Sequence, residues 1–489
     1  MPAPFVAEPF TFHDPDGTPV EVRGWGNQYH AVFETPDGYT VVPDPETGDY
    51  CYAVAGAGEL ASSGSRVGQV DPATLGVAPH LRPDRGAARV TAADSDEDEA
   101  PRRWEERRAE RRAIRHTGRA TGGITGDYVG LCVLVQFPDV DGAIPPDEVD
   151  KFCNQQGYTG FGNNGSVRDY FRDVSDGKLS YTNVVTRYLT ASRPRRYYAE
   201  PSVRWPRRAK ELAVEVLQQL VDEGFDFGRL SVDDRGFVYA FNLFYAGKRV
   251  NRWSEGLWPG ATALEPDFRV PGGGPIFRDL QWTDMGDQLT IGTFCHENGH
   301  MLCDFPDLYD YQYNSSGAGR FCLMSTSGGK NPVQVGAYLK AEAGWASRRT
   351  VIDPSQVATV EAGRNDFHVW EKDDQEYFIV ENRQQTGRDA SLPASGLAIW
   401  HVDERGSNSD EQMTPERHYE CSLEQADGRF QLERTANHDG DAGDLFGAPR
   451  ARRFADDTTP DSRWWNGRKS GLTIRNISAP GPTMTFGGP

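Results

Sequence analysis

The sequence predicts an α+β protein in which a helix with paired histidines lies between two regions rich in β-strands. Residues 1–84 and 350–489 contain short apolar runs separated by turn sequences. Residues 127–349 instead combine longer apolar runs with apolar positions spaced three and four residues apart. With 489 residues, the chain is long enough for two to four domains.

The first 126 residues are predicted to divide into a small β-rich module and a linker. Strands of the module, residues 1–84, are expected at residues 20–25, 29–33, 39–42 and 50–54. The linker, residues 85–126, contains an acidic block, an arginine-rich run at 102–112 and a glycine-rich end. The arginine-rich run can form a charged helix, but it has few apolar groups that could drive packing. We therefore expect a solvated linker whose exposed arginine pairs are sites of cleavage.

Residues 127–349 are predicted to form the domain that carries the paired histidines. The apolar runs at 128–137 and 237–245 are typical of strands. Helices are expected at residues 164–174, from Pro206 to Gly224, and at 336–344. The second of these helices has a proline that suits its first position and an apolar stripe formed by Leu212, Val216, Leu217 and Leu220.

The most informative segment of the chain is His296-Glu297-Asn-Gly-His300. Residues four apart lie on one face of a helix, so both imidazoles can bind one metal ion. Zinc held by three protein ligands keeps a position for water and lowers the pKa of that water. Glu297 is placed to take the proton of the water as a general base. The spacing therefore predicts zinc-dependent hydrolysis of peptide bonds.

Residues 350–489 are predicted to form a β-rich domain of the sandwich type, with strands at 376–381, 396–403, 472–478 and 483–486. This region also contains an aspartate-rich segment with Asp439, Asp441 and Asp444. Calcium prefers such oxygen ligands, although the spacing is not that of an EF-hand. Asp-Gly clusters also mark plain turns, so a calcium site and a turn both stay open.

Composition limits the partners and the compartment. The net charge of −20 disfavours nucleic acid as a partner. No apolar run approaches the roughly 20 residues of a membrane span. The first residues lack a basic start followed by an apolar stretch, so no secretory signal is recognised and the sequence indicates a cytoplasmic protein. We expect a monomer.

Several segments resemble the M6 family of metallopeptidases, the immune inhibitor A type. The likeness is carried by residues 164–171, 296–300, 306–310, 323–325, 377–383 and 396–403, and it covers most of residues 127–489. It implies a metzincin-like fold in which Met324 forms a Met-turn beneath the zinc. It also implies a metalloendopeptidase that is often made as a precursor and is secreted, with residues 1–84 as the leader module.

The third zinc ligand is less clear, because the chain departs from the wider pattern His-Glu-x-x-His-x-x-Gly-x-x-His/Asp, to which the resemblance points. Cys303 stands where that pattern has glycine, and Pro306 stands where it has the ligand. Asp307 matches the family's Pro-Asp-Leu-Tyr-Asp segment, so it is the preferred ligand. Asp304 is the alternative. The glycine normally lets the chain turn sharply after the helix, and one added residue can absorb that turn differently.

Two of the seven cysteines flank the predicted metal site. If the Met segment packs beneath the metal, Cys303 and Cys322 approach each other, which predicts a disulfide in an oxidising compartment. Two buried thiols are the alternative.

The sequence therefore predicts a zinc metalloendopeptidase that acts on protein or peptide substrates, with calcium as a second candidate cofactor. Two other functions stay open. One is an inactive, metalloprotease-like binding protein, and the other is a different zinc hydrolase such as an aminopeptidase.

Overall fold

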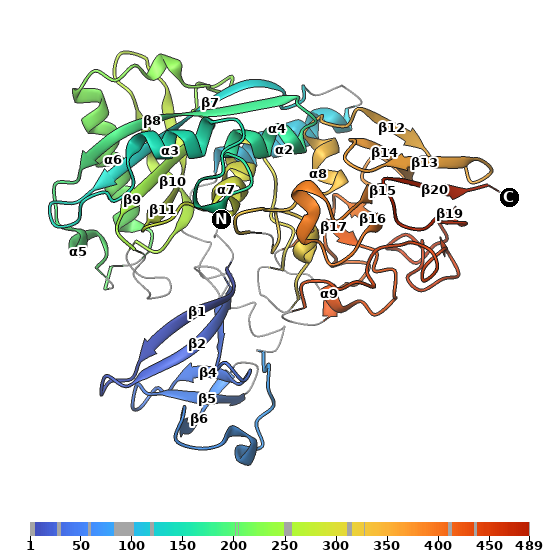
Figure 1. Ribbon diagram of the computed structural model, residues 1–489, viewed down its shortest axis with the longest axis horizontal. Helices are drawn as coiled ribbons and strands as arrows, with labels where there is room; N and C mark the ends of the chain where they lie inside the picture. Colours follow the sequence, from blue (N-terminus) through green and yellow to red (C-terminus); the bar gives the residue numbers. More distant parts are fainter. Residues whose placement is uncertain are drawn as a thin grey trace.

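A computed structural model describes residues 5–26, 31–56, 60–82, 102–117, 122–200, 202–203, 205–248, 257–310, 315–326, 328–408, 413–434 and 438–488. These residues form a mixed α/β structure with several sheets. Figure 1 shows a blue N-terminal sheet, a green region around a central sheet, and orange and red C-terminal sheets.

The N-terminal sheet is an antiparallel meander in which each strand pairs with the next along the chain. Its strands are β1 (Phe5–His13), β2 (Pro19–Gly26), β3 (Ala31–Glu34), β4 (Thr40–Pro43), β5 (Tyr50–Ala55) and β6 (Leu60–Arg66). The sequence prediction missed β1 and β6. Strand β6 has little apolar character, so it gives no signal of its own and depends on pairing with β5. The strand predicted at 29–33 lies partly outside the described residues.

The central sheet has the strand order β10-β11-β9-β7-β8. Its strands are β7 (Gly126–Gln136), β8 (Leu179–Thr190), β9 (Phe241–Ala246), β10 (Gly260–Arg269) and β11 (Ile276–Met285). Strand β7 is parallel to β8 and β9, and β10 forms an antiparallel edge. The strand predicted at 128–137 is confirmed, whereas the one predicted at 237–245 begins only at Phe241.

Helices cover both faces of the central sheet. The core on one face joins β7 with α3 (Pro146–Asn154), α4 (Val167–Val174) and α7 (Ile291–Cys303). The core on the other face joins β7 with α6 (Arg207–Asp222), and a short helix α5 (Arg195–Tyr198) precedes α6. Among the described residues, no helix is long and apolar enough to cross a membrane.

The predicted helices of this region are present. The side chain of Ser166 caps α4 by accepting from the backbone N–H of Asp169, and the apolar stripe of α6 is buried. Pro206 immediately precedes α6 instead of opening it, and Gly224 follows the helix with a φ of 72°. The helix predicted at 336–344 is α8 (Ala337–Glu342).

The expectation of a solvated linker is wrong for α2 (Arg103–His116), the helix formed by the arginine-rich run. Trp104 and two arginines of α2 are buried, because carboxylates from distant parts of the chain pair with the guanidinium groups. The Asp279 carboxylate on β11 accepts from the backbone N–H groups of Arg103 and Trp104, at 2.7 and 3.0 Å, which caps the helix. The acidic block at 94–99 lies outside the described residues.

The C-terminal region is built around a sheet of order β12-β14-β15-β16-β17. Its strands are β12 (Arg348–Val351), β14 (Asp366–Glu371), β15 (Glu376–Arg383), β16 (Gly396–Asp403) and β17 (Cys421–Leu423). The remaining elements are β13 (Val357–Glu361) paired with β20 (Thr483–Gly487), β18 (Phe454–Ala455) paired with β19 (Thr473–Ile474), and α9 (Gln431–Arg434). One face of the larger sheet packs against these strand pairs, and the other joins the core around α7.

Candidate metal centre

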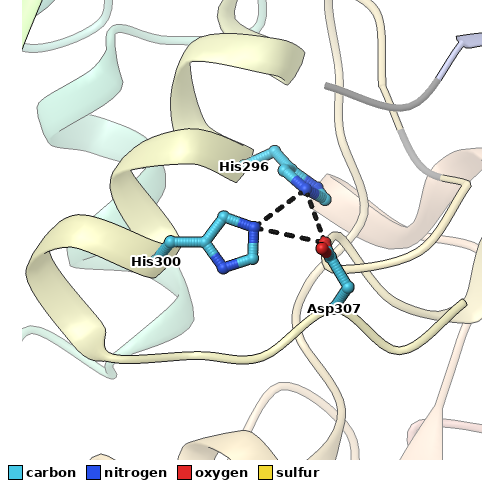
Figure 2. A group of neighbouring side chains, drawn as sticks. All are labelled: His296, His300 and Asp307. Carbon is cyan, nitrogen blue, oxygen red and sulfur yellow. Dashed lines mark hydrogen bonds and ion pairs between the residues drawn. The ribbon is translucent and has the colours of Figure 1, made fainter. Parts of the chain in front are cut away.

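Helix α7 holds both motif histidines inside the protein. Every residue from Phe294 to Cys303 is buried, and His296 and His300 are each only 2% exposed. As expected for residues four apart, the two side chains project from the same face of α7 toward the loop that follows the helix (Figure 2).

Asp307 completes the group from that loop. Its Oδ1 lies 3.0 Å from the Nε2 of His296 and 3.2 Å from the Nε2 of His300, and the two Nε2 atoms are 3.2 Å apart (Figure 2). Ligand atoms about 2.0–2.1 Å from a tetrahedral zinc ion are roughly 3.3 Å apart. The three atoms therefore have the mutual spacing of zinc ligands, and the preferred set of His296, His300 and Asp307 is brought together.

Backbone carbonyls orient both imidazoles. The Nδ1 of His296 lies 2.9 Å from the carbonyl oxygen of Leu323, and the Nδ1 of His300 lies 2.5 Å from that of Phe305. A carbonyl can only accept, so each Nδ1 donates and the Nε2 of each ring points to the centre of the group.

The carboxylates of Asp307 and Glu297 are buried without a well-oriented donor. No hydrogen bond reaches either oxygen of these two side chains, although both residues are at most 1% exposed. Burial works to raise the pKa of Asp307, but the His300 and His296 imidazoles outweigh it and lower that pKa well below its usual range. Burial raises the pKa of Glu297, and the imidazoles only partly counter it. Burying two carboxylates without hydrogen-bond donors costs free energy, and a bound cation would offset that cost.

Asp304, the alternative ligand, is not part of the group. It ends α7 in the left-handed conformation with a φ of 55°, and its backbone N–H donates to the carbonyl of His300. Its carboxylate pairs with Arg107 at 2.8 Å and with Arg111 at 3.0 Å. Asp304 therefore makes the turn one residue after the position where the wider pattern has glycine, and with that extra residue it is Asp307 that lies beside the histidines.

Met324 packs against Gly299 of α7. It is fully buried, and a Cβ added at Gly299 would lie 2.8 Å from its sulfur. The backbone N–H of Leu308 donates to the carbonyl of Met324 at 2.6 Å. Glycine is needed at position 299 for this close approach, and Met324 supports the loop that carries Asp307.

Helix α2 contributes residues that the sequence reasoning missed. Trp104 stacks on the imidazole of His300, with ring centroids 5.0 Å apart. Arg107 donates to the carbonyl of Met301 at 2.6 Å in addition to its bond with Asp304. The only signal in the sequence was a tryptophan within a charged helix, since these partners are nearly 200 residues away.

Asn298 was also missed, although it lies inside the motif. It is fully buried and accepts from the hydroxyl of Tyr181 at 2.6 Å, while its amide donates to Asn242 at 2.8 Å. These bonds fix α7 to strands β8 and β9, so the histidines are held on a rigid support.

A cleft of about 530 Å³ opens beside His296. Thr293, Arg320 and Ser325 contribute to its wall. Three residues of β1, Phe5, Ala7 and Glu8, line the same cleft. The N-terminal sheet therefore reaches the candidate metal centre through the beginning of its first strand.

The predicted disulfide is absent, because all seven cysteines are buried free thiols in the described residues. Cys303 ends α7 beside Asp304 and the arginines of α2. Cys322 instead lies among backbone groups of Met324 and Gly336 and near charged residues of β15. The two thiols thus lie in different surroundings, and the alternative of two buried thiols holds.

The predicted calcium group is only partly correct. Asp441 and Asp444 lie close together, but their third partner is Asp427. The Asp439 side chain lies 3.8 Å from Arg320 and lines the cleft. Asp427 lies outside the predicted aspartate-rich segment, so linear spacing could not show this partner.

The likeness to M6 metallopeptidases rests on short segments, and two of them, residues 296–300 and 306–310, contain the group itself. Short motifs describe the geometry of a site and not the rest of a fold. No model of a protein family matches the chain, and a comparison with curated proteins finds no significant match either.

Proposed function

We propose that this chain is a zinc-dependent metalloendopeptidase that cleaves protein or peptide substrates. One observation carries the proposal. His296, His300 and Asp307 present three ligand atoms at the mutual spacing of zinc ligands, beside the buried carboxylate of Glu297. A metzincin-like fold related to M6 peptidases belongs to this proposal and is supported by the position of Met324 under α7.

Each residue has a distinct role in the proposed reaction. When bound, zinc would polarise the scissile carbonyl and lower the pKa of a water molecule. Glu297 takes the proton of the attacking water on its carboxylate and delivers it to the leaving amine. With zinc bound, His296 and His300 would be neutral ligands, and the backbone carbonyls that accept from their Nδ1 atoms orient the Nε2 atoms toward the metal. The cleft beside His296 provides room for a peptide.

The direct test is Glu297→Gln. The amide has the same shape but cannot take a proton, so we expect the variant to keep about one zinc per chain and to lose roughly 10²–10⁴-fold in kcat. Zinc content by mass spectrometry and hydrolysis of a quenched peptide, with a chelator control, are the measurements. Full activity in the variant would remove Glu297 from the mechanism.

The same assay separates the competing functions. A peptide blocked at both ends is cleaved by an endopeptidase but not by an aminopeptidase. Wild-type protein that holds zinc and cleaves neither blocked nor free peptides would instead be an inactive binding protein.

A further inference from the structure

A second group of carboxylates lies in the C-terminal region, away from the candidate zinc ligands. Ligand oxygens of Asp427, Asp441 and Asp444 all lie within 4.8 Å of one another. Oxygens bound at 2.3–2.6 Å to one calcium ion are at most roughly 5 Å apart. One ion can therefore contact all three carboxylates.

Asp444 distinguishes this group from an ordinary acidic turn. It is fully buried, and no hydrogen-bond donor reaches its Oδ1. Its Oδ2 accepts from the backbone N–H of Asp441 at 2.6 Å, which fixes the orientation of the side chain. A buried carboxylate oxygen without a donor, next to two further carboxylates, is unfavourable unless a cation neutralises it.

The surrounding backbone shapes the group. The N–H of Gly443 donates to Oδ1 of Asp441 at 2.6 Å. A Cβ added at Gly443 would lie 2.9 Å from Oδ2 of Asp427 and 3.0 Å from Oδ1 of Asp441, so residue 443 has to be small. Among the described residues, the basic side chains paired with this group are Arg429, which is exposed and lies 3.4 Å from Asp427, and His438, which lies 3.7 Å from Asp441.

This loop touches the segment that forms part of the cleft. The N–H of Arg320 donates to the carbonyl of Asp439 at 2.9 Å, and a Cβ added at Gly440 would lie 2.4 Å from the ring of Phe321. Arg320 and Asp439 both line the cleft beside His296. A ligand that holds residues 438–444 in this conformation therefore also holds this wall of the cleft in place.

We propose that Asp427, Asp441 and Asp444 bind a calcium ion that fixes the 438–444 loop against the wall of the cleft. An all-carboxylate set favours a hard cation over zinc, and its irregular geometry suits calcium better than magnesium, which demands a near-octahedral site. The site does not depend on the proposed peptidase activity, because its ligands are separate from His296, His300 and Asp307.

The test measures calcium binding to the full chain. All proteins carry Glu297→Gln, because this substitution prevents self-digestion. With zinc held at one equivalent, we expect added Ca²⁺ to raise the Tm by several degrees, and Mg²⁺ to raise it less. Asp444→Asn should abolish the rise. Asp427→Asn, at the exposed rim, should weaken calcium affinity about tenfold or more in titration calorimetry. Asp457→Asn, a surface carboxylate paired with Arg453, is the control and should behave like the parent.

One readout separates a cation ligand from a merely structural aspartate. Without calcium, Asp444→Asn should have a Tm equal to or above that of the parent, because the amide removes an uncompensated buried charge. A lower Tm without calcium would assign Asp444 a structural role and overturn the proposal. Absence of a calcium-dependent Tm rise in the parent, or unchanged calcium affinity in Asp427→Asn, would overturn it as well. Since all of these readouts are binding and stability, they stay independent of the outcome for peptide hydrolysis.

Discussion

Asp304 and Asp307 show how one residue decides which carboxylate reaches the candidate metal centre. Asp304 takes the left-handed turn that ends α7, and its carboxylate is directed to Arg107 and Arg111. An aspartate in this conformation costs about 1–2 kcal/mol more than glycine. The two ion pairs compensate for that cost, and the loop then delivers Asp307 to both imidazoles.

Paired substitutions test this division of roles. Asp307→Asn should weaken zinc binding at least about a hundredfold, since even loss of a partner outside the ligand set costs 10–100-fold. Asp304→Asn should keep zinc, because asparagine tolerates the turn, but should lower the stability by about 1–3 kcal/mol through the lost ion pairs. Zinc competition with a chromogenic chelator and thermal unfolding measure the two effects. The reverse pattern would make Asp304 the ligand.

The ligands were predictable to different degrees. Helical periodicity alone places His296 and His300 together, and the His-Glu-x-x-His motif adds Glu297. Asp307 could be chosen over Asp304 only by likeness to a known segment, because loop geometry does not follow from spacing. Trp104 was not predictable, since its stacking on His300 joins residues far apart in the chain.

Helix α2 is the element whose role differs most from the sequence expectation. Its first turn is capped from β11, and Arg107 in its middle binds the end of α7. Toward its end, Arg112 lies 2.7 Å from Glu420, and Arg115 lies 2.6 Å from Glu404. The helix thus joins the central sheet, helix α7 and the C-terminal region.

Removing the central arginine should destabilise the protein. In Arg107→Met the Asp304 carboxylate loses a buried partner, so we expect the free energy of unfolding to fall by roughly 3 kcal/mol. Arg187→Met, which removes an exposed arginine paired with Glu223, should change it by less than about 0.5 kcal/mol. Chemical denaturation of the two variants is the measurement. Equal stability of the two variants would show that the contact of α2 with α7 does not stabilise the protein.

Elements were predictable where the local pattern and the tertiary environment agree. The apolar run of β7 and the stripe of α6 carry their own signal, and both are confirmed. For α2 the prediction of a helix was right, but its many charged residues indicated that the helix is exposed to solvent. Burial of Arg103 and Arg107 depends on the carboxylates of Asp233 and Asp304, which no local window contains.

At the scale of the whole molecule, the N-terminal sheet meets the rest of the protein at the cleft. The rings of Phe5 and Phe10 pack against Trp258, with centroids 5.7 and 5.8 Å apart. Phe5 and Glu8 also line the cleft that contains His296. Neither contact could be predicted from sequence, because the docking of a separately folded sheet depends on surfaces assembled from distant segments.

A sheet that reaches into the cleft should restrict access to it. A variant lacking residues 1–82 should therefore hydrolyse a quenched peptide with a kcat/KM raised about tenfold or more. Phe5→Ala in the full chain, which weakens the contact with Trp258, should act in the same direction but less. The truncated Glu297→Gln variant controls for contaminating proteases. An unchanged kcat/KM in a folded truncated protein would show that the sheet leaves the cleft accessible.

The central claim is that His296, His300 and Asp307 bind zinc together. A crystal structure of the zinc-loaded chain, with anomalous diffraction recorded on both sides of the zinc absorption edge, tests it most directly. The account predicts one strong anomalous peak about 2.0–2.2 Å from the Nε2 atoms of both histidines and from a carboxylate oxygen of Asp307. Folded protein with no peak at this position after incubation in excess zinc would contradict it.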